Sequence, residues 1–141
     1  MGRKEVDFAS LKQAASHYAG ERGYCTVIAL AVAAGVKFGK ARSAMARAGR
    51  LPRRGASIPQ IVEGHRELGL KLEIDEVLTM RCQRKGIRNI GHLLPKTGTF
   101  QIMSARHISC FHNGELQDWA ADARATNKRV QQIYRVLPTE E

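Results

Sequence analysis

The sequence lacks the long apolar runs, paired cysteines and leader segment that would place a chain in a membrane or an oxidising compartment. No uninterrupted apolar run reaches the roughly 18 residues that a bilayer-spanning helix needs, and the opening residues MGRKEVDFAS contain no apolar signal-peptide centre. The 3 cysteines are odd in number and form no C-x-x-C pair, which excludes a complete disulfide framework. We therefore expect free thiols, a cytoplasmic setting and no membrane partner.

Acidic residues are also scarce, since 13 Asp and Glu stand against 23 Lys and Arg, and the net charge is +10. Residues 37–54 hold many basic side chains and no acid, and the run RCQRKGIR over 81–88 adds more. Such a surface attracts phosphates, anionic polymers or an acidic protein. Nucleic acid and acidic proteins are therefore candidate partners, through a basic surface that would include Arg47, Arg50, Arg53 and Arg54.

The length of 141 residues, with 43% hydrophobic and 26% charged residues, predicts one domain over 1–141. Apolar spacing and capping signals predict helices in the first half, over 7–20, 25–35, 37–50 and 57–69. Alternating patterns predict a short strand at 70–74, a helical turn near 89–98, and strands at 99–103, 107–112, 115–119 and 129–137. This order indicates an α+β fold, with helices packed on one side of an antiparallel sheet.

Asn113-Gly114 lies between two alternating segments and predicts a two-residue hairpin loop. This register pairs His112 with Glu115 and puts Ser109 opposite Asp118. His107 and Asp118 then become diagonal neighbours on one face, roughly 7 Å apart between their Cα atoms. A slip of one residue would reverse the faces. Because Cys110 and His112 lie on the other face, a metal site that combines them with His107 is disfavoured, and we expect no cofactor.

Cys25 lies where the polar stretch ERGY meets the apolar helix CTVIALAVAAG. It is either a small buried residue that begins a core helix or a nucleophile, because a helix N-terminus favours the thiolate over the thiol. Cys82 and Cys110 are interpreted as structural, Cys82 in an exposed basic run. With His107 as base and Asp118 as the acid that orients the imidazole, Cys25 would complete a Cys-His-Asp set.

The segments GYCTVIALAVAAG and GTFQIMSARHISCFHNGELQDW resemble the small papain-like (cysteine-peptidase-like) proteins of bacteriophage and bacterial genomes. The resemblance covers roughly residues 23–119. It implies a papain-like fold with Cys25 as nucleophile, His107 as base and Asp118 as orienting acid. The sequence departs from the family in HYAGERGYC, which lacks the glutamine that usually precedes the cysteine as an oxyanion donor. Further candidates for oxyanion or substrate contacts are Tyr24, Arg22 and Ser109.

Three functions remain open on the sequence. The first is a papain-like thiol hydrolase (a peptidase, isopeptidase or amidase) that acts on a protein or peptide through an acyl-enzyme. The second is a non-catalytic phage or bacterial protein that engages a host protein or nucleic acid through the basic surface, in the host cytoplasm if it is phage-encoded. The third is acyl transfer by the same three residues.

Overall fold

The computed structural model describes residues 25–51, 56–105, 107–117 and 128–139. Its elements in chain order are α2 (Cys25–Ala34), α3 (Phe38–Arg47), α4 (Ile58–Glu67), β1 (Leu70–Ile74), α5 (Glu76–Cys82), the 3-10 turns η1 (Ile87–Asn89) and η2 (Gly91–Leu93), β2 (Thr99–Ser104), β3 (His107–His112), β4 (Glu115–Gln117) and β5 (Val130–Pro138). The α+β class is confirmed. The predicted helix over 7–20 lies outside the described residues.

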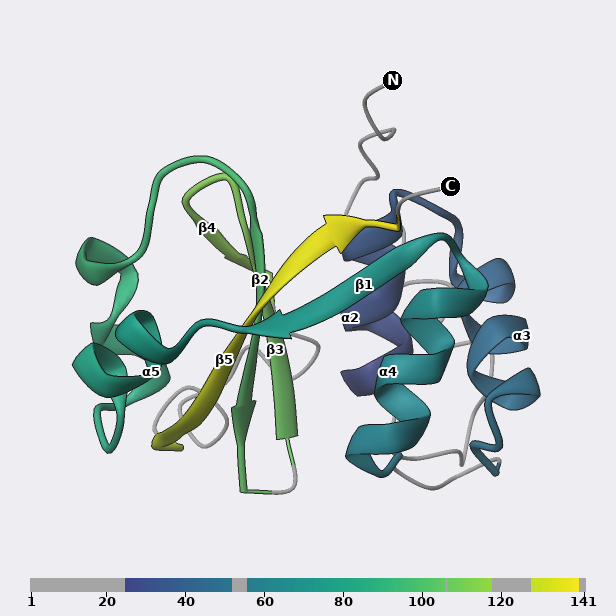
Figure 1. Cartoon of the computed structure of the whole chain (residues 1–141), viewed down its shortest axis with the longest axis horizontal. Helices are drawn as coiled ribbons and strands as arrows, with labels where there is room; N and C mark the ends of the chain where they lie inside the picture. Colours follow the sequence, from purple (N-terminus) through teal and green to yellow (C-terminus); the bar gives the residue numbers. More distant parts are fainter. Residues whose placement is uncertain (1–24, 52–55, 106, 118–127, 140–141) are drawn as a thin grey trace.

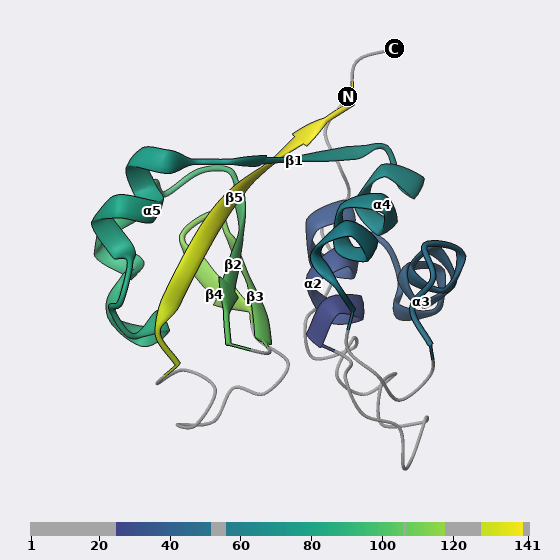
Figure 2. The same cartoon turned by 60° about the horizontal axis from the view of Figure 1, so that its bottom comes forward.

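The strands form one antiparallel sheet in the order β1-β5-β2-β3-β4. Helices α2, α3 and α4 lie on one side of this sheet, and α5 lies on the other (Figures 1 and 2). The prediction of helices on one side only is therefore wrong, because α5 was not foreseen. Its capping signal was readable: the Asp75 side chain accepts a hydrogen bond of 2.9 Å from the backbone N–H of Leu78.

Helix α2 is buried on every side, with residues 26–33 all buried, as its apolar sequence predicts. It packs on the face of the sheet that carries Met103, Ile108 and Cys110. It ends at Gly35, whose φ of 68° lies in the left-handed region that a side chain disfavours. Because α2 packs on this face, its first residue, Cys25, lies at one end of the sheet.

A buried polar network ties α2 and α4 to the centre of the sheet. Gln101 on β2 donates through Nε2 to the Ala29 carbonyl on α2 at 2.9 Å and lies 3.0 Å from His65 Nε2. His65 Nδ1 lies 2.8 Å from the Ile61 carbonyl within α4. The sequence alone suggests that His65 is a surface or capping residue, but its exposure is 0%. Burial lowers the pKa of His65 to about 4, and the hydrogen bond with Ile61 opposes this in part.

The predicted hairpin register is confirmed as far as the structure describes it, from His112 opposite Glu115 to Cys110 opposite Gln117. Cys82, in contrast, was predicted to be exposed and is fully buried. The basic run that contains it begins in the last turn of α5 and continues into η1, and Cys82 belongs to the cluster that packs between α5 and the sheet. Burial raises the pKa of the Cys82 thiol, and the charges of Lys85 and Arg81 lower it in part.

One irregularity shapes the end of the sheet where α2 begins. The pairing of β2 with β5 shifts between Met103, which faces Gln132, and Ser104, which faces Val130. Gln131 is therefore an extra residue on β5, as in a β-bulge. A bulge increases local twist and redirects neighbouring side chains, and bulges are frequent beside functional sites. Among the helices in the described ranges, none is both long and apolar enough to cross a bilayer.

Candidate active site

A pocket of about 570 Å³ lies where α2 and α4 begin, beside the end of the β2–β3 hairpin. The starts of two helices, the sheet end and β5 all contribute to its walls. The described residues that line it are Cys25, Thr26, Ala56, Ser57, Ile58, Ile61, Met103, Ser104, His107, Ile108, Gln131 and Gln132. The pocket therefore brings together two of the three residues predicted to carry catalysis, Cys25 and His107.

Cys25 is the first residue of α2 and is half-buried. It packs against the core cluster that contains Met103 and Ile108, and all three cysteines of the chain are free thiols. Cys82 and Cys110 each have an exposure of 0%. Cys25 is thus the one thiol of the three that is open to a substrate, and it lies at the positive end of a ten-residue helix dipole.

His107 is the first residue of β3 and pairs with Ser104 on β2. Because side chains alternate along a strand, His107 and Ser104 belong to the same face as Ile102, and this face packs towards α5. Met103 and Ile108 belong to the opposite face, which packs on α2. Residues from both faces nevertheless line the pocket. The pocket therefore lies around the end of the hairpin, next to the shift between Met103 and Ser104, and both Cys25 and His107 line it.

Gln132 is a site residue that the sequence reasoning missed. It lines the pocket from β5, and its Oε1 accepts a hydrogen bond of 2.8 Å from the Tyr134 hydroxyl. Burial raises the pKa of Tyr134, so its phenol stays protonated and remains a donor. An amide held through its oxygen presents its N–H₂ as a donor. In papain-like proteins the oxyanion-donor glutamine usually precedes the cysteine, so there was no reason in the sequence to look for it on the last strand. The only sequence signal for Gln132 was the Gln131-Gln132 pair within a strand pattern.

Of the other residues predicted to belong to the site, the structure describes only Ser109. Ser109 is fully buried, pairs with Ile102, and is absent from the described lining, so it is not a substrate contact. Asp118, Tyr24 and Arg22 lie outside the described residues. Their predicted roles stay predictions.

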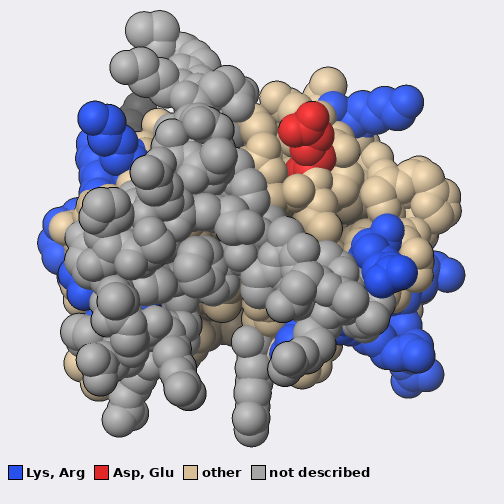
Figure 3. Space-filling view, turned by 180° about the vertical axis from the view of Figure 1, so that it is seen from behind, with Lys and Arg blue, Asp and Glu red and all other residues tan. Residues whose placement is uncertain are grey.

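The basic surface predicted around residues 47–54 is only partly present in the folded chain. Arg50 is buried, with 4% exposure, and so does not belong to a surface patch. Arg47 Nε lies 2.8 Å from Glu67 Oε1 on α4, which neutralises part of its charge. Arg53 and Arg54 lie outside the described residues. Figure 3 shows Lys and Arg side chains at both margins of the face in view, and the right-hand margin is the side that carries α5.

Within the described ranges, no three or more His, Cys, Asp and Glu side chains gather in a way that would hold a metal ion. The chemistry available at the pocket is that of a thiol, an imidazole and amide groups. Comparisons with protein-family models, with curated proteins and with solved structures found no match to this chain.

Proposed function

We propose that this protein is a thiol hydrolase with a papain-like arrangement, in which Cys25 attacks an amide or ester carbonyl and His107 moves the proton. The observation that carries the proposal is that Cys25, the one partly exposed thiol, and His107 line the same pocket. These two residues lie 82 positions apart in the sequence. Nucleophilic catalysis by a thiol requires a base near it, and the shared lining of one pocket by two residues so distant in the sequence supports that pairing.

In the proposed reaction, His107 takes the Cys25 proton and the thiolate attacks the substrate carbonyl carbon. The tetrahedral oxyanion is stabilised by the Cys25 backbone N–H and by Gln132 Nε2, and collapses with transfer of the proton from His107 to the leaving amine or alkoxide. A thioester on Cys25 remains. Water, deprotonated by His107, hydrolyses it and restores the thiol. Asp118 is the proposed residue that orients the imidazole.

The pocket walls favour an apolar group beside the scissile bond. Ile61, Met103 and Ile108 are buried residues of its lining, and Ile58 is partly exposed at its rim. Hydrophobic walls with a few polar groups are typical of substrate pockets. A volume of about 570 Å³ accommodates a side chain and neighbouring backbone rather than a whole folded protein. We therefore propose a peptide or acyl amide whose apolar group enters between α4 and the sheet.

The test is acylation by p-nitrophenyl acetate, followed by mass spectrometry of the intact chain and its peptides. We expect a burst of nitrophenolate and an acetyl thioester at Cys25. His107→Ala should slow acylation about 100-fold, in the range typical of a lost general base. His92→Ala is the matched control, because His92 is exposed on η2 across the sheet and should leave the rate unchanged.

Selective alkylation of Cys25 alone would not establish the proposal, since burial already protects Cys82 and Cys110. The decisive readout is the dependence on His107. If His107→Ala acylates at the wild-type rate across pH 6 to 9 while circular dichroism shows it folded, His107 is not the base and the hydrolase proposal fails. If thioester formation is normal but added amines capture the acyl group in preference to water, the same site performs acyl transfer.

A further inference from the structure

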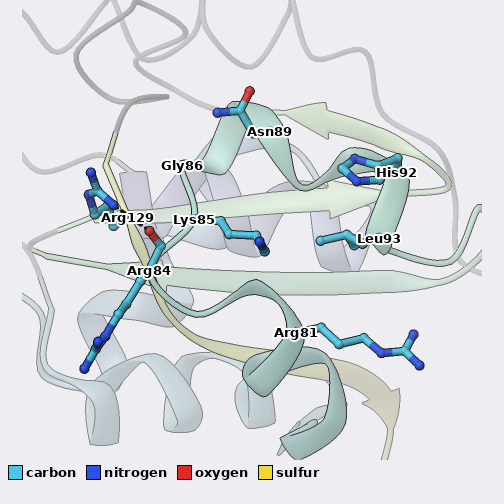
Figure 4. A pocket seen from close by; sticks show the side chains of 8 residues that line it. All are labelled: Arg81, Arg84, Lys85, Gly86, Asn89, His92, Leu93 and Arg129. Atoms are coloured by element: carbon cyan, nitrogen blue, oxygen red, sulfur yellow. Dashed lines mark hydrogen bonds between the residues drawn. The ribbon is translucent and has the colours of Figure 1, made fainter.

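A second, larger pocket lies between the end of α5, the turns η1 and η2, and the start of β5. Its volume is about 1010 Å³. Basic side chains dominate its walls: Arg81, Arg84, Lys85 and Arg129, with Asn89 and His92 beside them. Figure 4 shows Lys85 in the middle of the pocket, Arg84 and Arg129 on one side, and His92 on the opposite side. Nothing in the proposed hydrolase mechanism uses these groups.

Among the described residues that line this pocket, no acidic side chain compensates the basic ones. Four lining residues carry permanent positive charge, and none of the described lining residues is acidic. Like charges held together repel one another, and repulsion is relieved when an anion binds among them. The described acids of α5 and its cap, Asp75 and Glu76, stand at the opposite end of that helix from Arg81. An anion is therefore the ligand that the pocket selects.

The backbone beneath these side chains is held firmly. The N–H of Arg84 donates to the Val130 carbonyl at 3.0 Å, and the N–H of Val130 donates to the Lys85 carbonyl at 2.9 Å. Ile87 N–H donates to the Lys128 carbonyl at 3.0 Å. Arg84 has a φ of 70°, in the left-handed region that is costly for a residue with a side chain. These bonds hold it there and bring two distant basic segments, 81–85 and 128–129, to one place.

Arg129 contributes to this frame as well as to the charge. Its Nη1 donates to the Arg84 carbonyl at 2.8 Å, so its guanidinium is fixed beside the loop (Figure 4). A planar guanidinium presents paired N–H donors that match two oxygens of a phosphate, and Lys adds a mobile point charge. The Asn89 amide and the His92 imidazole supply further donors. The volume exceeds what inorganic phosphate fills and suits several linked phosphates or a phosphorylated molecule.

We propose that this pocket binds phosphate groups, presented either by a nucleic-acid backbone or by a free polyphosphate or nucleotide. The proposal is independent of the hydrolase site, because the two pockets share no described lining residue. It places the anion-binding groups in the segment 81–93 with Arg129, which overlaps the predicted basic run 81–88 and not the run 37–54.

The test compares two doubly substituted chains of equal net charge. Arg81→Gln with Lys85→Gln removes two pocket cations while leaving the Arg84 and Arg129 backbone contacts in place. Lys37→Gln with Lys40→Gln removes two exposed charges at the start of α3 and is the matched control. Binding of a fluorescein-labelled 12-nucleotide oligo-dT is followed by anisotropy over 50 to 300 mM NaCl, and binding of sodium tripolyphosphate by calorimetry. Thermal melting without ligand verifies that both variants fold.

We expect the pocket variant to lose at least 10-fold in affinity and the control variant less than 3-fold. If the ligand is the nucleic-acid backbone, the slope of log K against log salt should fall by about 1.4 for two lost phosphate contacts to a single strand. Tripolyphosphate binding that displaces the oligonucleotide identifies free polyphosphate as sufficient. Equal loss in both variants, or no binding of either ligand by the wild type, overturns the proposal. Poly-glutamate that binds as tightly as the oligonucleotide also overturns it, since the pocket would then not select phosphate.

Discussion

His65 offers the sharpest quantitative test of this structure, because it is a fully buried base at the junction of α2, α4 and the sheet. Its Nε2 faces a Gln101 amide N–H, and its Nδ1 faces the Ile61 carbonyl. Both contacts are satisfied by the neutral ring with its proton on Nδ1. A second proton on Nε2 would point at the Gln101 amide donor and would place a charge in the core. We therefore predict that acid weakens the fold through this one residue.

The magnitude follows from the pKa of His65, which burial lowers from 6.5 to about 4. Above pH 6.5 the ring is neutral in both the folded and unfolded chains, so it contributes no pH dependence. Below that value the unfolded chain takes up a proton that the folded chain refuses, and the free energy of unfolding falls until about pH 4. A difference of one pKa unit corresponds to about 1.4 kcal/mol, so the total loss is about 3 kcal/mol. That is a large part of a typical domain stability of about 5–15 kcal/mol.

The assay is urea unfolding, followed by circular dichroism, from pH 7.5 down to pH 4.5. His65→Gln should be less stable at neutral pH. Between pH 6 and pH 4.5, however, the slope of its free energy of unfolding should be shallower than that of the wild type by about 1 kcal/mol per pH unit. His92→Gln, which removes an exposed histidine, should keep the wild-type slope. Identical slopes for wild type and His65→Gln would refute the buried network. A His92→Gln slope as shallow as that of His65→Gln would refute the assignment of the effect to burial.

Three further predictions concern the site and the helices that build it. Gln132→Glu should lower the rate of thioester formation at Cys25 by roughly 100-fold or more in stopped-flow acylation, because a carboxylate cannot donate to the oxyanion; an unchanged rate would remove Gln132 from the mechanism. Gly64→Ala should destabilise the chain by about 1–3 kcal/mol, because the new methyl group would meet the Met45 sulfur across the α3–α4 contact. Gly39→Ala is the matched control, since nothing lies within 4 Å of the new methyl group. It should stabilise the chain by up to about 1 kcal/mol. Equal melting temperatures for Gly64→Ala and Gly39→Ala would contradict the close packing of α3 on α4. Ser57→Ala should cost about 1 kcal/mol in chemical denaturation through loss of the α4 cap; no measurable loss would mean that the capping box is unimportant.

The candidate site was only partly predictable, and the reason is geometric. A thiol at a helix start and a histidine at a strand start are local features, so Cys25 and His107 were identifiable from the sequence. Gln132 was not, because its place depends on how β5 pairs with β2 and on the extra residue at Gln131. The basic pocket was hidden for the same reason, since Arg129 reaches the 84–87 loop only through pairing with the last strand.

The sequence by itself determined most local elements of this protein: the apolar helix at 25–34, the capped helix at 58–67 and the register of the β3–β4 hairpin. Each depends on residues within a few positions of one another, where spacing and capping act directly. Only the tertiary structure decided which faces became buried. It placed His65 and Cys82 in the core, Arg50 under the surface, and α5 on the second face of the sheet. Burial is a property of distant segments packed together, so periodicity along one segment does not reveal which partner will cover it.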